Sequence, residues 1–340
     1  MRRLLVHSAL LIATCASAHA ATSFCVDSAA SLQAALTQSQ ADGDDDYIYL
    51  VAGTYAIGSG LAFASSEPYN LILAGGWDAG CNGPGGETLL DGQHAVRPLQ
   101  VAIDAGNLLV QRITFIAGRA DAAGAGLAAT SESGNLNILM SQFVGNRSSS
   151  SGGALHARSG TGNLVVFGNL AYGNRAAQVG GMLLELEGGG EARVVNNTIV
   201  ANIADLPSVP GGLVVAGGAH FAISNNILWN NAANGGSDFG ALAPHSRHSN
   251  DIGVVASGTE PDAVSGELSV NPRFEECGGF LCIGFEPARD SPLVDAGDDL
   301  ALADFGPGLV DLAFLPRTIG PHVDIGAYEN EALFADGFEP

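Results

Sequence analysis

The sequence contains no lysine, so arginine supplies all 13 basic residues, against 35 aspartate and glutamate residues. The formal net charge is −22 at pH 7, and the isoelectric point is about 4.4. Such an acidic surface repels phosphate groups, which argues against nucleic acids and anionic membranes as partners. Charged residues make up only 14% of the chain and aromatic residues 6%, whereas glycine occurs 47 times. This composition directs attention to internal repeats.

Beyond its start, the chain has no run of about 18 apolar residues, the length that a transmembrane helix needs. At the start, Arg2 and Arg3 precede an apolar segment that ends in the small-x-small pattern Ala18-His19-Ala20. We interpret residues 1–20 as a signal peptide. Its removal takes away two positive charges and changes the net charge from −22 to −24. The protein is therefore expected to be secreted or held at the cell surface, in association with the outer membrane, rather than kept in the periplasm.

Cysteines are few, and four of them follow residue 20: Cys25, Cys81, Cys277 and Cys282. An even number of cysteines in an exported protein suggests disulfides, and four cysteines allow three pairings. The short C-G-G-F-L-C loop favours Cys277–Cys282, which leaves Cys25–Cys81 to fasten the N-terminal end. Zinc binding is the alternative, but the close cysteines lack C-x-x-C spacing.

Segments that begin at Asn107, Asn135, Asn163, Glu191 and Ala219 align without gaps, each 28 residues after the one before. Within each segment apolar residues alternate as they do on a strand, for example Leu108 with Val110. A unit this short cannot bury its own apolar face, so its neighbours must cover it. The pattern predicts an all-β protein, a single-domain right-handed parallel β-helix.

Further columns of the repeat support stacking of one coil on the next. One apolar column holds Phe115, Phe143, Ala171, Ile199 and Ile227; one asparagine column holds Asn146, Asn174, Asn202 and Asn230, and another holds Asn169, Asn197 and Asn225. Asparagines at one level of successive coils can pass side-chain hydrogen bonds along the stack and satisfy buried turn groups. We interpret both asparagine columns as structural ladders; sugar binding is the alternative.

The same reading divides the chain into parts. Residues 21–44 are expected to form an N-terminal cap, with a helix that begins at Ser28 or Ser31. Coils are expected over residues 45–270, with the repeat clearest at 107–234. Residues 271–330 are expected to form a C-terminal coil and cap, and 331–340 a tail without an assigned role.

Two groups of motifs resemble known proteins. The units Phe143-Val-Gly-Asn-Arg with Gly152-Gly-Ala-Leu, and Tyr172-Gly-Asn-Arg with Gly180-Gly-Met-Leu, resemble the repeats of polymorphic outer-membrane proteins. Ser291-Pro-Leu-Val-Asp-Ala-Gly-Asp and Val323-Asp-Ile-Gly-Ala-Tyr-Glu are similar to the closing segment of bacterial choice-of-anchor surface proteins. The resemblance covers roughly residues 45–330 and implies a pectin-lyase-like fold.

Pectin-lyase-like folds include enzymes that degrade polysaccharides, so the resemblance calls for a search for their catalytic residues. Pairs of lysine and arginine cannot occur here because lysine is absent, and no R-x-P-x-x-R motif is found. We therefore predict no catalytic residues and a protein that presents a lateral face to carbohydrate or another cell-surface component. The alternative is a polysaccharide lyase or glycoside hydrolase with an unfamiliar active site.

Two sets of residues are candidates for binding. Arg119, Arg147 and Arg175 share one column and are candidates for binding an acidic glycan. We favour an exposed turn ladder, because like charges stacked so closely repel one another. Asp295, Asp298, Asp311 and Asp324 are candidate ligands of a structural Ca²⁺ ion if the C-terminal segment brings them together. The alternative is that Asp324 and Glu329 pair with Arg317 and cap backbone amides. No other cofactor is expected, and the protein is expected to be a monomer.

Overall fold

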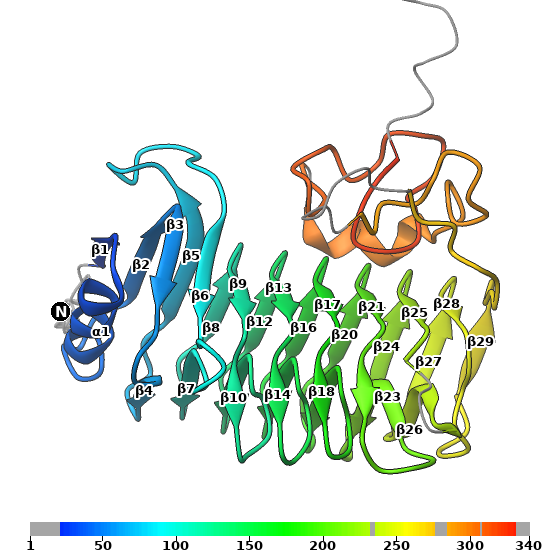
Figure 1. The fold of residues 1–340 in the computed structure, drawn as a ribbon, viewed down its shortest axis with the longest axis horizontal. Coiled ribbons are helices and arrows are strands. Elements are labelled where there is room, and N and C mark those ends of the chain that lie inside the picture. The colour runs from blue at the N-terminus through cyan, green and yellow to red at the C-terminus, as the bar shows by residue number, and fades with distance from the viewer. Residues whose placement is uncertain (1–20, 232–234, 276–283, 307, 331–340) are drawn as a thin grey trace, which may run out of the picture.

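The computed structural model describes residues 21–231, 235–275, 284–306 and 308–330. In this part the chain winds into a right-handed parallel β-helix, which confirms the predicted fold class. The four coils over residues 108–216 each pass through four parallel sheets, here named A, B, D and C in chain order. Figure 1 shows the coils side by side along the long axis.

The strands of each sheet come from successive coils. Sheet A contains β1 (Thr22–Val26), β2 (Asp46–Val51), β5 (Leu71–Trp77), β8 (Leu108–Gln111), β12 (Leu136–Leu139), β16 (Leu164–Phe167), β20 (Ala192–Val195), β24 (Phe221–Ser224), β27 (His245–His248) and β29 (Ala263–Ser265). Sheet B contains β3 (Gly53–Ala56), β6 (Thr88–Asp91), β9 (Thr114–Ile116), β13 (Gln142–Val144), β17 (Leu170–Tyr172), β21 (Thr198–Val200), β25 (Ile227–Trp229) and β28 (Asp251–Ile252).

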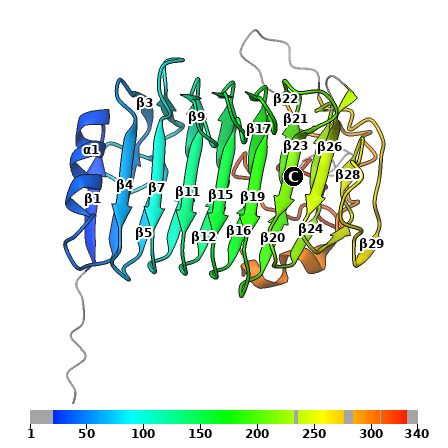
Figure 2. The same cartoon turned by 90° about the horizontal axis from the view of Figure 1, so that it is seen from below.

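The other two sheets complete the coil. Sheet C contains β4 (Leu61–Ser65), β7 (Leu99–Ile103), β11 (Leu127–Ser131), β15 (Leu155–Ser159), β19 (Met182–Leu186), β23 (Pro210–Ala216) and β26 (Ser237–Leu242). Sheet D is short and contains β10 (Arg119–Ala120), β14 (Arg147–Ser148), β18 (Arg175–Ala176) and β22 (Ile203–Ala204). Figure 2 shows the strands of sheet C in front, with the C-terminal segment behind the solenoid.

The predicted repeat matches the strand register of sheets A, B and D over four coils, whereas β15 and β19 of sheet C pair at a spacing of 27 residues. Leu108 pairs with Leu136, which pairs with Leu164, and all three side chains are fully buried. The rings of Phe115 and Phe143 stack with their centroids 5.2 Å apart. The core is therefore a continuous column of apolar side chains that each coil shares with its neighbours.

The gap-free alignment is wrong by one residue in the fifth coil. Ala192 pairs with Phe221, which lies 29 residues later, because a longer loop before β23 is only partly offset by a shorter turn after it. Ile199 consequently pairs with Leu228. The apolar column therefore continues through Leu228, and the prediction that Ile227 belongs to it is wrong. For the same reason the asparagine columns continue through Asn226 and Asn231, and the predicted members Asn225 and Asn230 are wrong.

The other predicted asparagines form ladders of hydrogen bonds. In each buried rung, the backbone N–H and Nδ2 of one asparagine donate to Oδ1 of the asparagine in the next coil, as from Asn174 to Asn202. The two buried ladders are Asn146–Asn174–Asn202–Asn231 and Asn169–Asn197–Asn226–Asn250. They end on carboxylates, of Asp238 and Glu267 respectively. The carboxylate supplies a charged acceptor where the last amide donors would otherwise have none.

A helix covers the N-terminal end of the solenoid. Helix α1 (Ala29–Gln38) begins at Ser28, whose hydroxyl forms a capping box with Ser31, and it buries Leu32 and Leu36 on the first coil. Ser28 and Ser31 were both predicted as possible N-cap residues, and in the structure the N-cap is Ser28. Within the described residues, no helix is long and apolar enough to cross a membrane.

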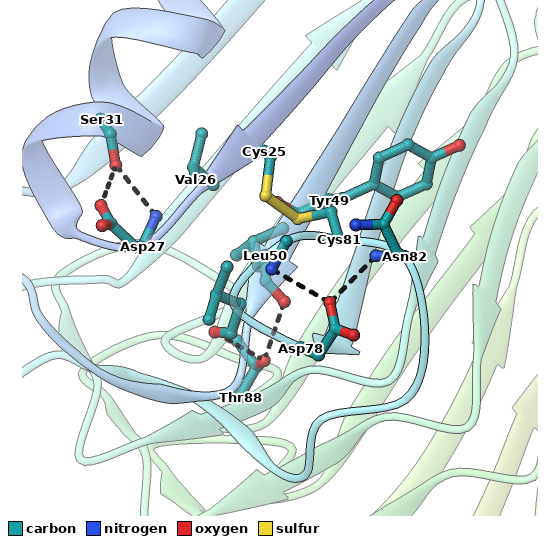
Figure 3. Close-up of a disulfide and its surroundings, with 12 residues drawn as sticks. Cys25, Val26, Asp27, Ser31, Tyr49, Leu50, Asp78, Cys81, Asn82 and Thr88 are labelled. Atoms are coloured by element: carbon teal, nitrogen blue, oxygen red, sulfur yellow. Dashed lines mark hydrogen bonds between the residues drawn. A yellow bond between two sulfur atoms is a disulfide. The ribbon is translucent and has the colours of Figure 1, made fainter.

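A disulfide ties β1 to the loop between β5 and β6. Cys25 and Cys81 are bonded, as one of the predicted pairings requires, and Figure 3 shows the bond beside Tyr49 of β2. The other predicted pair, Cys277 and Cys282, lies outside the described residues. So do the predicted signal peptide (1–20) and the tail (331–340).

The C-terminal segment, residues 284–330, folds back along one side of the solenoid rather than across its last coil (Figure 1). It contains the short helix η2 (Asp299–Phe305). Leu293 and Ile325 pack on Val200 and Ile227 of sheet B, and all four side chains are buried. The packing of these apolar side chains holds the segment over the later coils and leaves the earlier coils of sheet B uncovered.

Candidate functional site

A groove of about 400 Å³ lies over β9 and β13 of sheet B. The loop between β5 and β6 rises on one side of it and the C-terminal segment on the other, as Figure 1 shows. This volume falls within the range of about 300–1,000 Å³ that is typical of small-ligand pockets. Three parts of the chain line the groove: Gly76, Gly86 and Glu87; Arg112, Ile113, Thr114, Met140 and Gln142; and Asp311, Leu312, Phe314 and Tyr328.

The floor of the groove begins at a corner of the solenoid where sheets A and B meet. Successive coils place left-handed residues there: Arg112 (φ 57°), Met140 (φ 44°), Gly168 (φ 64°), Asn196 (φ 53°) and Asn225 (φ 58°). Asn196 Nδ2 donates to the Asp324 carbonyl (3.0 Å) and Asn225 Nδ2 to the Asp298 carbonyl (3.0 Å). The later coils thus use this corner to dock the C-terminal segment, whereas Arg112 and Met140 line the groove.

Arg112 is half-buried, and its guanidinium carbon lies 4.8 Å from the centroid of the Phe314 ring. Its Nε atom is buried without a hydrogen-bond partner, and no carboxylate of the described residues forms an ion pair with it. Burial lowers the pKa of Arg112 from its ordinary value. Its Nη atoms are not enclosed and form no hydrogen bond with the described residues, so they are available to a molecule in the groove.

Polar side chains supply the rest of the lining. Thr114 on β9 donates its hydroxyl proton to Glu87 (2.9 Å), which fixes that exposed carboxylate at the edge of the groove. Gln142 lies at the start of β13 and is half-exposed. Tyr328 is buried, and burial, reinforced by neighbouring carboxylates, raises the pKa of its hydroxyl so that the phenol stays protonated. The groove therefore offers both donors and acceptors.

Asp311 organises the loop that carries Phe314. Its Oδ1 accepts from the backbone N–H groups of Ala313 (2.9 Å) and Leu315 (2.8 Å), and its Oδ2 accepts from the backbone N–H of Glu329 (2.8 Å). Burial raises the pKa of Asp311, while these hydrogen bonds oppose the rise. Both oxygens are engaged by the protein itself, so this carboxylate shapes the wall of the groove.

The three predicted arginines do form one column. Arg119, Arg147 and Arg175 pair across β10, β14 and β18 of sheet D and are exposed, on the side of the solenoid away from the C-terminal segment (Figure 1). Arg175 forms an ion pair with Asp205 (2.5 Å), but within the described chain Arg119 and Arg147 have none. Their binding of an acidic glycan stays a prediction.

The four predicted calcium ligands do not converge. Asp324 accepts from the backbone N–H groups of Asp295 (2.6 Å) and Asn330 (2.7 Å), and Asp298 caps η2 by accepting from Leu300 (3.0 Å). Across the described ranges, no group of three or more histidine, cysteine, aspartate or glutamate side chains could hold a metal ion. Together with Asp311, these carboxylates bind backbone amides, which was the alternative interpretation.

Arg317 provides the positive charge at the centre of this segment. Its side chain is 2% exposed, and its Nη2 donates to the carbonyls of Asp324 (3.1 Å) and Gly326 (2.5 Å). Glu329 lies 3.6 Å from the same nitrogen, and burial raises the pKa of Glu329 to about 8. The charge of Arg317 stabilises the closely packed acids and carbonyls that give the segment its shape.

Comparison with protein-family models, with curated proteins and with solved structures gave no match. The parallel β-helix is established by the structure itself. The resemblance to polymorphic outer-membrane and choice-of-anchor proteins depends on the quoted motifs alone.

Sequence reasoning missed the groove and its principal residues, Glu87, Arg112, Phe314 and Tyr328. One signal was present: in the 28-residue alignment Arg112 shares a column with Met140, Gly168 and Asn196. The other coils have uncharged residues at this corner position. A charged residue there indicates that Arg112 has a function specific to its own coil.

Proposed function

We propose that this protein is a secreted or cell-surface β-helix protein that binds carbohydrate on its lateral face without degrading it. The groove over β9 and β13 carries the proposal, because Phe314, Arg112 and Glu87 line a single cavity there. A sugar ring has an apolar face that packs on an aromatic side chain, and its hydroxyl groups both donate and accept hydrogen bonds. The lining matches these requirements.

Other features support export. The Cys25–Cys81 disulfide is of a kind that persists in oxidising compartments, which agrees with the predicted signal peptide. The net charge of −22 favours solubility outside the cell.

The test is to incubate the purified protein with neutral and acidic polysaccharides, with and without calcium, and to measure both retention and turnover. New reducing ends, or unsaturated products that absorb near ~235 nm, would report cleavage. Retention without cleavage supports the proposal. Cleavage would instead favour a polysaccharide lyase or glycoside hydrolase, and absence of both would favour a structural envelope protein. Loss of acidic-glycan retention in Arg147→Glu would assign that binding to the arginine column.

A further inference from the structure

The groove can be assigned a class of ligand and two residues that hold it. We infer that it binds a neutral hexopyranose unit, whose apolar face stacks on Phe314 and whose hydroxyl groups accept hydrogen bonds from Arg112. The inference rests on the proposed carbohydrate-binding function and adds the kind of sugar and its two principal contacts.

Two arginine–phenylalanine pairs join the solenoid to the C-terminal segment, and they differ in one respect. Arg193 lies 4.6 Å from the Phe305 ring, and its guanidinium also donates to Asp304 (3.2 Å) and to the Ala301 carbonyl (2.6 Å). Phe305 in turn packs on Phe167, with ring centroids 4.5 Å apart. The guanidinium donors of Arg193 thus have partners within the protein, and this pair holds the C-terminal segment on the solenoid.

In the second pair, Arg112 with Phe314, the guanidinium group has no hydrogen-bond or ion-pair partner within the described residues. Arg112 has a buried Nε without a partner, and in the described part of the chain no acid pairs with it. Phe314 is 56% exposed, and both residues line the groove. The Nη atoms of Arg112 have no hydrogen-bond partner in the described residues either, and unlike Nε they are not enclosed, so they can donate to a ligand hydroxyl group.

The backbone of Phe314 indicates that its position is imposed. Its φ is 69°, in the left-handed region that a bulky residue rarely adopts. Such a conformation persists only where the surroundings enforce it, and the Asp311 carboxylate does so by accepting from the residues on both sides, Ala313 and Leu315. The loop therefore fixes an exposed aromatic ring over the groove before any ligand arrives, which reduces the entropy lost on binding.

The charge of the groove favours a neutral sugar over a uronate. Its lining contains one guanidinium group, on Arg112, and two carboxyl groups, on Glu87 and Asp311. The whole chain adds a net charge of −22, which repels acidic polysaccharides. Hydroxyl groups of a neutral sugar can donate to Glu87 and accept from Arg112, whereas a carboxylate would face Glu87 unfavourably.

The experiment uses matched variants of the two pairs. Phe314→Leu and Arg112→Met change the groove, while Phe305→Leu and Arg193→Met make the same changes at the docking pair. Calorimetric titration with linear oligosaccharides of glucose, mannose or galactose, and with oligogalacturonate and oligomannuronate, measures affinity for each class. Circular dichroism melting shows that each variant is folded.

We expect a neutral oligosaccharide to bind, with the affinity reduced about tenfold in each groove variant and unchanged in each docking variant. A saccharide that binds equally to wild type and groove variants would overturn the inference but leave the proposed function intact. Binding of uronate oligosaccharides alone would overturn the assignment to neutral sugars. Failure of every saccharide to bind would overturn both the inference and the proposed function.

Discussion

Replacement of Asn202 by alanine tests whether the buried amide ladders stabilise the solenoid. Asn202 is fully buried, and its Oδ1 accepts from the N–H (3.0 Å) and Nδ2 (2.9 Å) of Asn174 in the preceding coil. Its Nδ2 donates to the carbonyls of Ala171 (2.9 Å) and Val200 (3.2 Å) and to Asn231 Oδ1 (3.0 Å). Truncation removes these hydrogen bonds and leaves the backbone N–H of Asn174 without an acceptor inside the protein, whereas Asn174 Nδ2 keeps the Phe143 and Tyr172 carbonyls.

The expected loss follows mainly from that N–H group. A buried donor left without a partner costs about 1–3 kcal/mol, so Asn202→Ala should lower the free energy of unfolding by about 2–3 kcal/mol. Water cannot easily take the place of the missing amide, because the surrounding coils enclose the site.

A third ladder supplies the control. It begins at Asp45 and lies near the surface, and its members are Asn70, Asn107, Asn135 and Asn163. In this ladder each asparagine donates to the preceding coil, whereas in the buried ladders each donates to the next coil. In this ladder Asn135 Oδ1 accepts from the N–H of Asn163 (2.8 Å), but the side chain is half-exposed. Water can therefore replace it, and Asn135→Ala should cost about 1 kcal/mol or less.

Urea unfolding followed by circular dichroism measures both losses. Equal losses for Asn202→Ala and Asn135→Ala would refute the argument, because burial of the unsatisfied donors would then not determine the cost. A small loss for both would show that the strands alone hold the coils in register.

Three further predictions concern stability. Cys25→Ser should lower the unfolding free energy by about 4 kcal/mol, because the disulfide joins residues 56 positions apart; a denaturant midpoint equal to that of the oxidised wild type would contradict this. Burial raises the pKa of Asp251 from 3.8 to about 6, so the folded state binds its proton more tightly and stability falls as pH rises through this range. Asp251→Asn should be more stable than wild type by about 3 kcal/mol at pH 7 and equal to it below pH 4, and a constant difference would exclude this residue as the cause. Arg317→Met should cost about 3–5 kcal/mol and loosen the C-terminal segment, which fluorescence of Trp229, packed against that segment, would report as a red shift absent from wild type.

The repeat explains how much of the fold could be predicted. In stacked coils, contacting residues are separated by a constant number of positions. The contacts among Leu108, Leu136 and Leu164 can therefore be predicted from their spacing along the sequence. The same logic placed Asn174 and Asn202 in a ladder and Arg119 beside Arg147. These predictions required no knowledge of distant contacts.

The errors arose where the spacing changes. Asn225 was assigned to a ladder, but the 29-residue coil moves it to the corner, where its side chain binds the Asp298 backbone. A gap-free alignment cannot detect a longer loop partly offset by a shorter turn, because only the strand register shows which residue faces the next coil.

The sequence by itself therefore determined the parallel β-helix and the ladder columns over up to three coils, because these depend on a pattern that recurs. It also determined the N-terminal helix, because that helix depends on local capping and apolar residues. The tertiary structure alone decided the groove. Arg112 and Phe314 are about two hundred positions apart and meet because Leu293 and Ile325 pack on Val200 and Ile227. Those apolar contacts form once and have no period, so nothing in the order of residues indicates which coils the C-terminal segment covers and which it leaves open.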